Sequence, residues 1–319
     1  MCVNCETAVC VYPCTAAGRD VYHAMSEGQH GTVHSIYAKA LYLAMGPNQL
    51  ILCCGEAYGS IPFGVALPDT ALARIRERLR VGMEVCFEAD GLVFPTANLQ
   101  LTVPKAAVPQ RQEPLRWGEK ACCWKQAQAL LLQRRKNVGL TNLASDLPNG
   151  NMIGKDPLQL RAYRNFEKLL KNIAAEDPEK SRQALTGLLG LGAGLTPSAD
   201  DILTGFFYCW TRQPGGGTFR ADLCQKLGRL AWARTTSVSA CYLTAAAQGA
   251  YFELLDRLLR ATFGEYDLKS AIDNLLSVGS CSGGEMAAGL LLGCWFYQTQ
   301  NHSAWSGIKK EKANVSSCM

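Results

Sequence analysis

Residues 190–201 read GLGAGLTPSADD, a glycine-rich loop closed by a proline that leads into the strongly apolar run 202–210. Proline, serine and acidic residues directly before an apolar run are typical of the start of a buried helix. The alternating glycines allow backbone conformations and close approaches that a side chain would block. We therefore expect a tight loop followed by a core helix, and a helical fold around that helix.

A pattern in the second half of this stretch, Ser-x-x-acid-x-x-x-Gly, occurs again further along the chain, each time at the head of an apolar run. The corresponding pairs are Ser198 with Ser282, Asp201 with Glu285, and Gly205 with Gly289. Each copy matches a capping box, in which the serine caps the helix and the acid reaches back to the backbone of the cap. On its own, this interpretation predicts two well-capped buried helices without a ligand. Because glycines also permit close helix packing, we hypothesise that the two N-terminal loops lie side by side.

The glycines before the first box, Gly192 and Gly194, favour an anion site, because unpaired N–H groups at a helix start attract negative charge. The stretch lacks the Gly-Lys-Ser/Thr of a Walker loop, and Pro197 stands near the place of the third glycine in a dinucleotide fingerprint. Phosphate or carboxylate is therefore the expected ligand class. Asp200 and Asp201 could instead hold a magnesium ion, although one of them would then not be available as the cap acid.

A third candidate helix start lies at residues 234–239, where Thr235, Thr236 and Ser237 belong to a cluster of four hydroxyls. Serine and threonine are common at helix starts for capping alone. Arg234 adds a cation suited to phosphate or carboxylate. Both the capping and the ligand-binding interpretations stay open for this segment.

The composition describes a globular protein: 319 residues, 48% hydrophobic and 18% charged. The longest apolar runs, 202–210 and 286–297, are shorter than the roughly 20 residues that span a bilayer. We see no secretory signal at the N-terminus and expect a cytoplasmic protein without membrane partners. The net charge of +5 comes without a basic face interleaved with aromatics, so no nucleic-acid partner is expected.

The chain has fifteen cysteines, scattered and often adjacent, which does not resemble a secreted disulfide framework. Cys2, Cys5, Cys10 and Cys14 have a spacing that could surround a zinc ion. The gap between the two pairs is much shorter than in zinc fingers, so we favour free thiols over zinc.

The residue pattern predicts an α+β protein with four segments. These are a cysteine-rich extension at 1–22, a β-rich, barrel-like domain at 23–110, a larger all-α domain at 115–300 with two central glycine-containing apolar helices, and a polar tail at 301–319. Three prolines within 104–114 mark the boundary between the two domains.

Extended segments are expected at 33–45, 49–54, 61–67, 83–87 and 92–103, with a helix at 69–80. The sequence Asp-Gly at 90–91 favours a hairpin turn, because both residues tolerate positive φ. Helices are expected at 120–136, 157–175, 178–189, 199–212, 219–234, 237–263, 268–278 and 284–300.

Three segments, 190–205, 235–249 and 271–293, together resemble the AllH-like family, which includes one subunit of the bacterial oxamate carbamoyltransferase of anaerobic allantoin breakdown. A fainter match at 31–41 contains His34 and Ser35. The resemblance implies a protein that works with two other subunits to interconvert oxalurate plus phosphate with oxamate plus carbamoyl phosphate. The chain departs from the family pattern at two places: Ala193 stands where the family usually has proline, and Ser280 where it often has histidine.

We expect Thr196, Ser198 and Asp201 to be catalytic, through charge stabilisation of a tetrahedral oxyanion rather than through a nucleophile. The remaining residues expected to bind substrate are Gly192, Gly194, Arg234, Thr235, Thr236, Ser237, Ser282, Gly283, Glu285, His34 and Ser35. Two alternatives remain: a structural or regulatory subunit whose glycine loops only pack, and a carboxylate- or phosphate-binding enzyme of another catabolic pathway.

Overall fold

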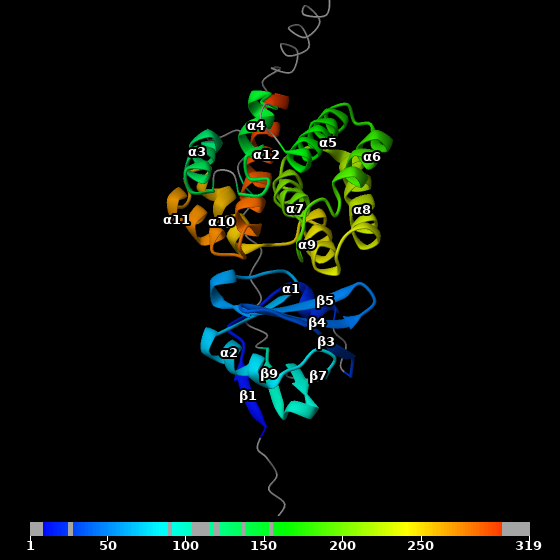
Figure 1. The fold of residues 1–319 in the computed structure, drawn as a ribbon, viewed down its shortest axis with the longest axis vertical. Coiled ribbons are helices and arrows are strands. Elements are labelled where there is room, and N and C mark those ends of the chain that lie inside the picture. The colour runs from blue at the N-terminus through cyan, green and yellow to red at the C-terminus, as the bar shows by residue number, and fades with distance from the viewer. Residues whose placement is uncertain are drawn as a thin grey trace, which may run out of the picture. The chain divides into compact units, whose positions relative to one another are not determined.

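The computed structural model describes residues 9–24, 28–88, 91–103, 115, 117, 122–135, 138–152 and 156–301. The chain divides into two compact units (Figure 1). The first consists of Met1–Pro114 with Ala250–Asp256, and the second of Leu115–Gly249 with Arg257–Met319. Strands are the main secondary structure of the first unit and helices that of the second, so the chain is α+β as predicted.

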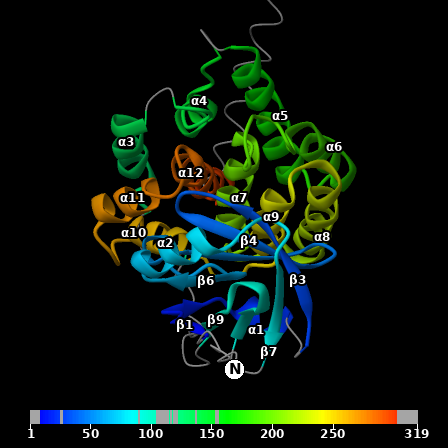
Figure 2. The same ribbon diagram turned by 60° about the horizontal axis from the view of Figure 1, so that its bottom comes forward.

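A single curled sheet of nine strands, shaped like a half-barrel, forms the first unit (Figure 2). Its order is β1-β9-β8-β7-β3-β4-β5-β6-β2. All neighbours are antiparallel except β1 with β9 and β5 with β6. The strands are β1 Cys10–Pro13, β2 Ala16–Ala17, β3 His30–Ile36, β4 Ala40–Gly46, β5 Gln49–Gly55, β6 Gly64–Leu67, β7 Glu84–Glu88, β8 Gly91–Phe94 and β9 Leu99–Thr102.

The core of this unit lies between the sheet and its two α-helices, α1 (Arg19–Ala24) and α2 (Asp69–Arg78). Leu72 and Ile75 of α2 belong to one buried cluster with Leu43 and Val65 of the sheet. Two short 3₁₀ turns, Glu56–Tyr58 and Pro95–Ala97, connect strands. Burial of this apolar cluster is the main stabilising contribution of the first unit.

The structure refines the strands expected from the sequence. The segments 33–45 and 92–103, each expected as one extended piece, are two strands each, β3 with β4 and β8 with β9. The hairpin expected around Asp-Gly is confirmed by the antiparallel pairing of β7 and β8, with Glu88 opposite Gly91. The two residues between them lie outside the described part of the chain. The short strands β1 and β2 were not expected.

The described part of the second unit is helical. Its helices are α3 Trp124–Arg135, α4 Leu143–Asn149, α5 Pro157–Ala174, α6 Pro178–Leu188, α7 Ser198–Trp210, α8 Gly217–Arg234, α9 Ser237–Ala247, α10 Glu253–Ala261, α11 Leu268–Leu276 and α12 Ser282–Asn301. The first residues of α10 are grouped with the first unit.

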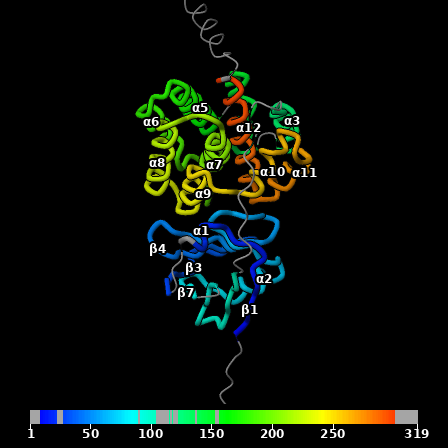
Figure 3. Tube along the Cα trace, turned by 180° about the vertical axis from the view of Figure 1, so that it is seen from behind, coloured from blue at the N-terminus to red at the C-terminus, as the bar shows by residue number. Residues whose placement is uncertain are grey.

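Helices α7 and α12 lie at the centre of the helical unit (Figures 1 and 3). Helices α3, α10 and α11 flank the pair on one side, and α5, α6 and α8 flank it on the other. Every residue of α7 after Ser198 is buried. A helix that is apolar all round belongs in a core, which agrees with the two central helices predicted from the sequence.

Asp-Pro dipeptides start two of the surrounding helices. Asp156 accepts a hydrogen bond from Gln159 N at 2.8 Å at the start of α5, and Asp177 accepts one from Lys180 N at 3.0 Å at the start of α6. Both carry proline at the first helical position, where the missing N–H has no cost.

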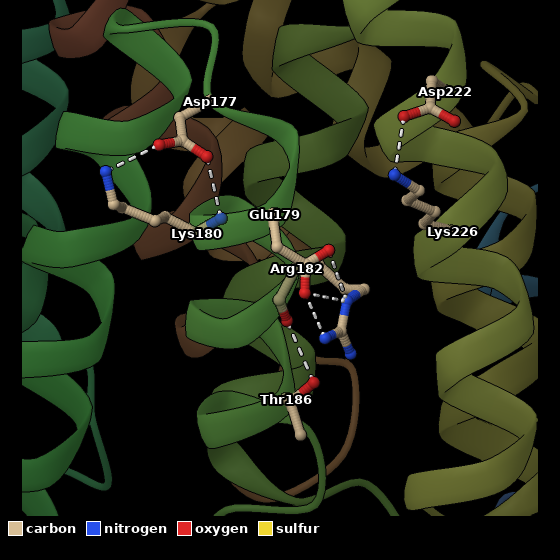
Figure 4. A network of polar contacts seen from close by, with 7 residues as sticks. All are labelled: Asp177, Glu179, Lys180, Arg182, Thr186, Asp222 and Lys226. Atoms are coloured by element: carbon tan, nitrogen blue, oxygen red, sulfur yellow. Dashed lines mark hydrogen bonds and ion pairs between the residues drawn. The ribbon is translucent and has the colours of Figure 1, made fainter.

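The exposed face of α6 carries a ladder of polar contacts (Figure 4). Asp177 also pairs with Lys180 Nζ at 2.9 Å, and Glu179 pairs with Arg182. The hydroxyl of Thr186 donates to the carbonyl of Arg182 at 2.9 Å. Exposed pairs of this kind contribute little to stability, and they provide control positions for experiments on the core.

Two expectations for the helical unit were wrong. The segment 237–263 is two helices, α9 and α10, because Gly249 adopts a left-handed φ of 67° just after α9 and ends it. The short helix α4 was not expected, since it contains Pro148 and no long apolar pattern.

The crossing of α7 and α12 is reciprocal. A Cβ on Gly205 would lie 1.9 Å from the carbonyl oxygen of Met286, and a Cβ on Gly289 would lie 1.9 Å from the carbonyl oxygen of Ile202. Ile202 and Met286 occupy the same place in the sequence repeat. The two copies of the repeat therefore pack backbone to backbone in a quasi-two-fold arrangement that only glycine permits.

Candidate functional site

The loops before α7 and α12 lie side by side, as hypothesised from the repeat. The hydroxyl oxygens of Thr196 and Ser282 are 2.9 Å apart and share a hydrogen bond. Both side chains are partly exposed. This hydroxyl pair is the point at which the two copies of the repeat meet.

The start of α9 joins the same cluster. Thr236 caps α9 by accepting a hydrogen bond from Ser239 N at 3.1 Å, and its hydroxyl donates to the carbonyl oxygen of Leu195 at 2.6 Å. The capping interpretation of this segment is therefore correct for Thr236, and the same side chain holds the glycine loop. We use the term helix-start cluster for residues 190–201, 234–239 and 280–285.

Asp200 connects the glycine loop to the start of α9 through its carboxyl group. Its Oδ1 accepts the N–H of Gly190 at 2.9 Å, and its Oδ2 accepts the hydroxyl of Thr235. Burial raises the pKa of Asp200, while hydrogen bonds from Thr235, Gly190 and Ser239 act in the opposite direction. Both carboxyl oxygens of Asp200 are thus occupied by groups of the protein.

Asp201 and Glu285, the two repeat-related acids, are buried together, with 2% and 0% of their surfaces exposed. Oε1 of Glu285 accepts the N–H of Leu140 at 2.9 Å. Burial and the charge of Glu285 raise the pKa of Asp201 well above its usual range, while hydrogen bonds from Ser282 and Thr196 lower it. Asp201 Oδ2 and Glu285 Oε2 are buried oxygens without a hydrogen-bond partner.

The loop between α3 and α4 is a part of the site that the sequence reasoning missed. A Cβ on Gly139 would lie 2.1 Å from Glu285 Oε1 and 3.5 Å from Ser198 Oγ. Next to Leu140, the buried hydroxyl of Thr141 has no partner. A signal was present, because Gly-Leu-Thr at 139–141 repeats Gly-Leu-Thr at 194–196.

The capping-box interpretation of both repeats was wrong. Ser198 is the first residue of α7, its preceding cap is Pro197, and no side chain caps this helix. The acids do not reach back to their own helix starts, since Glu285 accepts from Leu140 of another loop. The N–H of Ala199 already donates to the carbonyl of Leu191 at 3.0 Å. The first turn of α7 therefore offers fewer N–H donors to an anion than we expected.

The predicted glycines have distinct roles. Gly192, with φ at 129°, leaves no room for a side chain, because a Cβ would lie 2.5 Å from the N of Ser198. Gly283 is equally restricted by the carbonyl of Leu275, at 1.8 Å from such a Cβ. Gly194, with φ at 92°, is exposed, and a Cβ there would have no neighbour within 4 Å.

Comparison with known proteins places these segments in a family. A profile described as Oxamate carbamoyltransferase subunit AllH matches residues 188–294, and one described as AllH family N-terminal domain matches residues 12–108. The chain belongs to the AllH family. The first match contains all three helix starts of the cluster, and the second contains most of the curled sheet. No solved structure matches the chain.

The family assignment identifies the chain as a carbamoyltransferase-type subunit and points to other subunits of that enzyme as its partners. At the two departures from the AllH pattern, Ala193 is exposed in the glycine loop and Ser280 lies directly before α12. The carbonyl of Ser280 accepts a hydrogen bond from Arg135 at 3.1 Å.

The other predicted residues of this AllH chain belong to the ends of two helices of the second unit and to a strand of the first. Arg234 is exposed at the end of α8, and Ser237 is the first residue of α9. His34 and Ser35 lie on β3 in the first unit, where His34 Nδ1 is 3.1 Å from Ser35 Oγ. They form a separate pair in the other unit of the chain.

No metal is assigned to the AllH chain by its geometry. Within the described ranges, no three His, Cys, Asp or Glu side chains gather into a metal-binding group. Asp200 and Asp201 have different partners, so magnesium at these two residues stays a prediction. Cys10 and Cys14 are free thiols, while Cys2 and Cys5 lie outside the described residues. In the described part of the chain, no helix has the length and apolar character of a membrane span.

Proposed function

We propose that this AllH chain is a cytoplasmic subunit of a complex that interconverts oxalurate plus phosphate with oxamate plus carbamoyl phosphate, and that its helix-start cluster binds the small anions. The observation that carries the proposal is the convergence of three helix starts on the Thr196–Ser282 hydroxyl pair. Helix N-termini carry partial positive charge, and hydroxyls can donate to carboxylate or phosphate oxygens.

In this proposal the residues have separate tasks. Thr196 and Ser282 donate to the anion, Ser198 and the exposed glycine loop around Gly194 contact it, and Arg234 supplies positive charge from the edge. In carbamoyl transfer, the amide nitrogen of oxamate attacks the carbamoyl carbon, and phosphate leaves with the electrons of the broken C–O bond. The tetrahedral intermediate carries a negative oxygen, which preorganised donors stabilise.

A magnesium ion at Asp200 or Asp201 would be an addition to this arrangement. Carboxylate oxygens are suitable ligands for Mg²⁺, and a bound ion would bridge a phosphate. If the prediction holds, chelation should abolish phosphate binding and added Mg²⁺ should restore it. Binding of phosphate that is indifferent to a chelator would remove magnesium from the site.

A second candidate, a structural or regulatory subunit, is favoured by one observation. The polar groups of the cluster largely satisfy one another, with Thr196 on Ser282, Thr236 on Leu195 and Asp200 on Thr235. Such closed pairing stabilises a fold without a ligand. Under this alternative, the partner subunits carry the chemistry.

The experiment that separates the candidates is calorimetric titration with oxamate, phosphate and carbamoyl phosphate, with the purified chain and with its complex. Thr196→Val and Ser282→Ala each remove one hydroxyl of the pair. We expect each to weaken oxamate binding about three- to tenfold, the size of one lost hydrogen bond.

Thr186→Val is the matched control, because the hydroxyl of the half-buried Thr186 donates to the carbonyl of Arg182 within α6, outside the helix-start cluster. It should bind oxamate like the unchanged protein. If neither the chain nor the complex shows saturable heat lost in Thr196→Val, the anion site is wrong and the structural candidate stands.

A further inference from the structure

The hydroxyl pair of Thr196 and Ser282 neighbours a buried carboxyl, that of Asp201. Asp201 is buried while both hydroxyls are partly exposed, and hydrogen bonding from Ser282 and Thr196 lowers the pKa of its carboxyl. Asp201 is therefore in a position to act on a ligand through the two hydroxyls, without touching the ligand itself.

The protonation state of Asp201 determines whether the hydroxyl pair can donate a hydrogen bond to a ligand. Each hydroxyl has one proton to donate and can accept two hydrogen bonds. One proton is used between Thr196 and Ser282, which are 2.9 Å apart. If Asp201 is ionised, it accepts the remaining proton, and only hydroxyl lone pairs face outward. If Asp201 is neutral, it can donate to the pair, and a hydroxyl proton is free for an external acceptor.

Glu285 favours the neutral form of Asp201. Glu285 sits at the equivalent position of the neighbouring helix, and its Oε1 is fixed as an acceptor by the N–H of Leu140 at 2.9 Å. Two carboxylates that are buried together without a cation between them do not both ionise at low cost. Asp201 Oδ2 and Glu285 Oε2 are both buried without a hydrogen-bond partner, which is costly for an ionised carboxylate.

We propose that Asp201, buried beside Glu285, keeps its proton, and that this proton leaves a hydroxyl of the Thr196–Ser282 pair free to donate a hydrogen bond to a carboxylate ligand. Asp201 is thus a positioning residue, and the proton on the pair sets whether the site attracts or repels an anion. The inference rests on the proposed anion site and specifies its ligand: an acceptor-only group such as the carboxylate of oxamate.

The charged groups around Asp201 agree with this assignment. From α7 comes Asp200, from α12 Glu285, and from the loop before α12 Cys281, whose thiol pKa is raised by burial and by both carboxyls. From α3, Arg135 approaches Gly284, but its guanidinium donates to the carbonyls of Ser280 and Leu276. The nearby charges are thus mainly negative, and burial followed by Glu285 gives the largest increases in the pKa of Asp201.

The test is oxamate binding between pH 5.5 and pH 9, measured by calorimetry on the full complex. The carboxylate of oxamate stays ionised over this range, so changes in affinity report on the protein. For the unchanged protein we expect the affinity to fall with rising pH, by about tenfold for each unit above the pKa of Asp201.

Two variants have opposite expected effects. Asp201→Asn presents a permanent N–H donor to the hydroxyls, so its affinity should stay within about threefold of the acidic value and not change with pH. Glu285→Gln removes the neighbouring charge, so Asp201 should ionise at lower pH and the fall in affinity should move to lower pH. Asp177→Asn, an exposed cap on α6, is the matched control and should follow the unchanged protein.

An affinity of the unchanged protein that is constant from pH 5.5 to pH 9 would overturn the inference and leave the anion site intact. Loss of binding in Asp201→Asn at every pH, with normal unfolding, would also overturn it. Absence of oxamate binding in the unchanged complex at all pH values would overturn the proposed function itself. The infrared band of a protonated Asp carboxyl, present at pH 7 and lost in Asp201→Asn, tests the proton without any ligand.

Discussion

Asp201 is the residue whose burial has the clearest thermodynamic consequence. Its pKa in the folded chain is raised, first by burial and then by Glu285, so the unfolded chain releases this proton at lower pH than the folded one. The stabilising contribution of the neutral carboxyl is complete at acidic pH and is lost as the pH rises through the folded-state pKa. Alkaline conditions should therefore weaken the helical unit.

Asp201→Asn tests this sign, because asparagine keeps the shape of the side chain and cannot ionise. We expect the variant to gain stability relative to the unchanged protein as the pH rises, by up to about 1.4 kcal/mol per pH unit below the folded-state pKa of Asp201 and with no further gain above it. Urea unfolding followed by circular dichroism from pH 5.5 to pH 9 measures the difference.

The control at the residue scale is Asp177→Asn. Hydrogen bonds from Lys180 lower the pKa of Asp177, so its contribution is present at neutral pH and lost on acidification. Between pH 5.5 and pH 9 Asp177 stays ionised in the folded and the unfolded chain, so the stability difference of Asp177→Asn should be small and constant over this range. A difference between Asp201→Asn and the unchanged protein that is the same at every pH would contradict the raised pKa.

Sequence reasoning identified Asp201 and Glu285 as a pair, because the repeat places them at equivalent positions. It assigned them the wrong role, because the same pattern, a serine followed three residues later by an acid, fits both a capping box and a buried carboxyl. What distinguishes the two is the loop at 139–141, which supplies Leu140 N–H to Glu285 from far away in the sequence. Contacts between distant segments cannot be derived from a local pattern. The repeated tripeptide Gly-Leu-Thr was the one sequence feature that connected residues 139–141 with the site.

At the scale of elements, the glycine crossing of α7 and α12 determines where the helix starts lie. Gly205→Ala and Gly289→Ala would each place a methyl group 1.9 Å from a carbonyl oxygen of the other helix. Because the crossing is reciprocal, we expect similar losses of stability from the two changes, at least the roughly 1–3 kcal/mol typical of overpacked cores. The free energy of unfolding from urea titration measures both.

Gly228→Ala in α8 is the matched control, because the nearest atoms to its added Cβ belong to Thr244 at 3.7 Å, an ordinary contact. It should raise stability by about 0.5–1 kcal/mol, as alanine is the better helix former. If Gly205→Ala behaves like Gly228→Ala, the helices are not in backbone contact. If Gly205→Ala and Gly289→Ala lose very different amounts of stability, the two halves of the crossing are not equivalent in energy.

The elements themselves were largely predictable where periodicity and caps agree. The Asp-Pro starts of α5 and α6 and the apolar runs of α7 and α12 were read correctly from the sequence. The wrong predictions have local causes. Gly249 divides a continuous apolar pattern into α9 and α10, and α4 was not predicted because it contains Pro148. In the sheet, β1 pairs with β9, almost 90 residues later in the sequence, a pairing that turn signals cannot reveal.

At the scale of the whole molecule, the positions of the histidines suggest that the chain binds the substrate and that the catalytic base lies elsewhere. The four histidines are His23, His30, His34 and His302, so residues 115–301 contain none. Carbamoyl transfer to oxamate requires a base that takes a proton from the attacking amide nitrogen, and histidine is the side chain best suited to this near neutral pH. The cluster supplies hydroxyls and buried carboxyls, and Asp201 is inferred to keep its proton, so we expect the base to come from elsewhere in the complex.

We therefore expect the chain alone to bind oxamate but to form no detectable oxalurate from oxamate and carbamoyl phosphate. Adding the partner subunits should restore turnover, because the family designation is that of a subunit and the missing base would come from the complex. Release of phosphate, followed in a coupled assay, measures the rate. Turnover by the chain alone would contradict this expectation and would show that the base belongs to the chain itself.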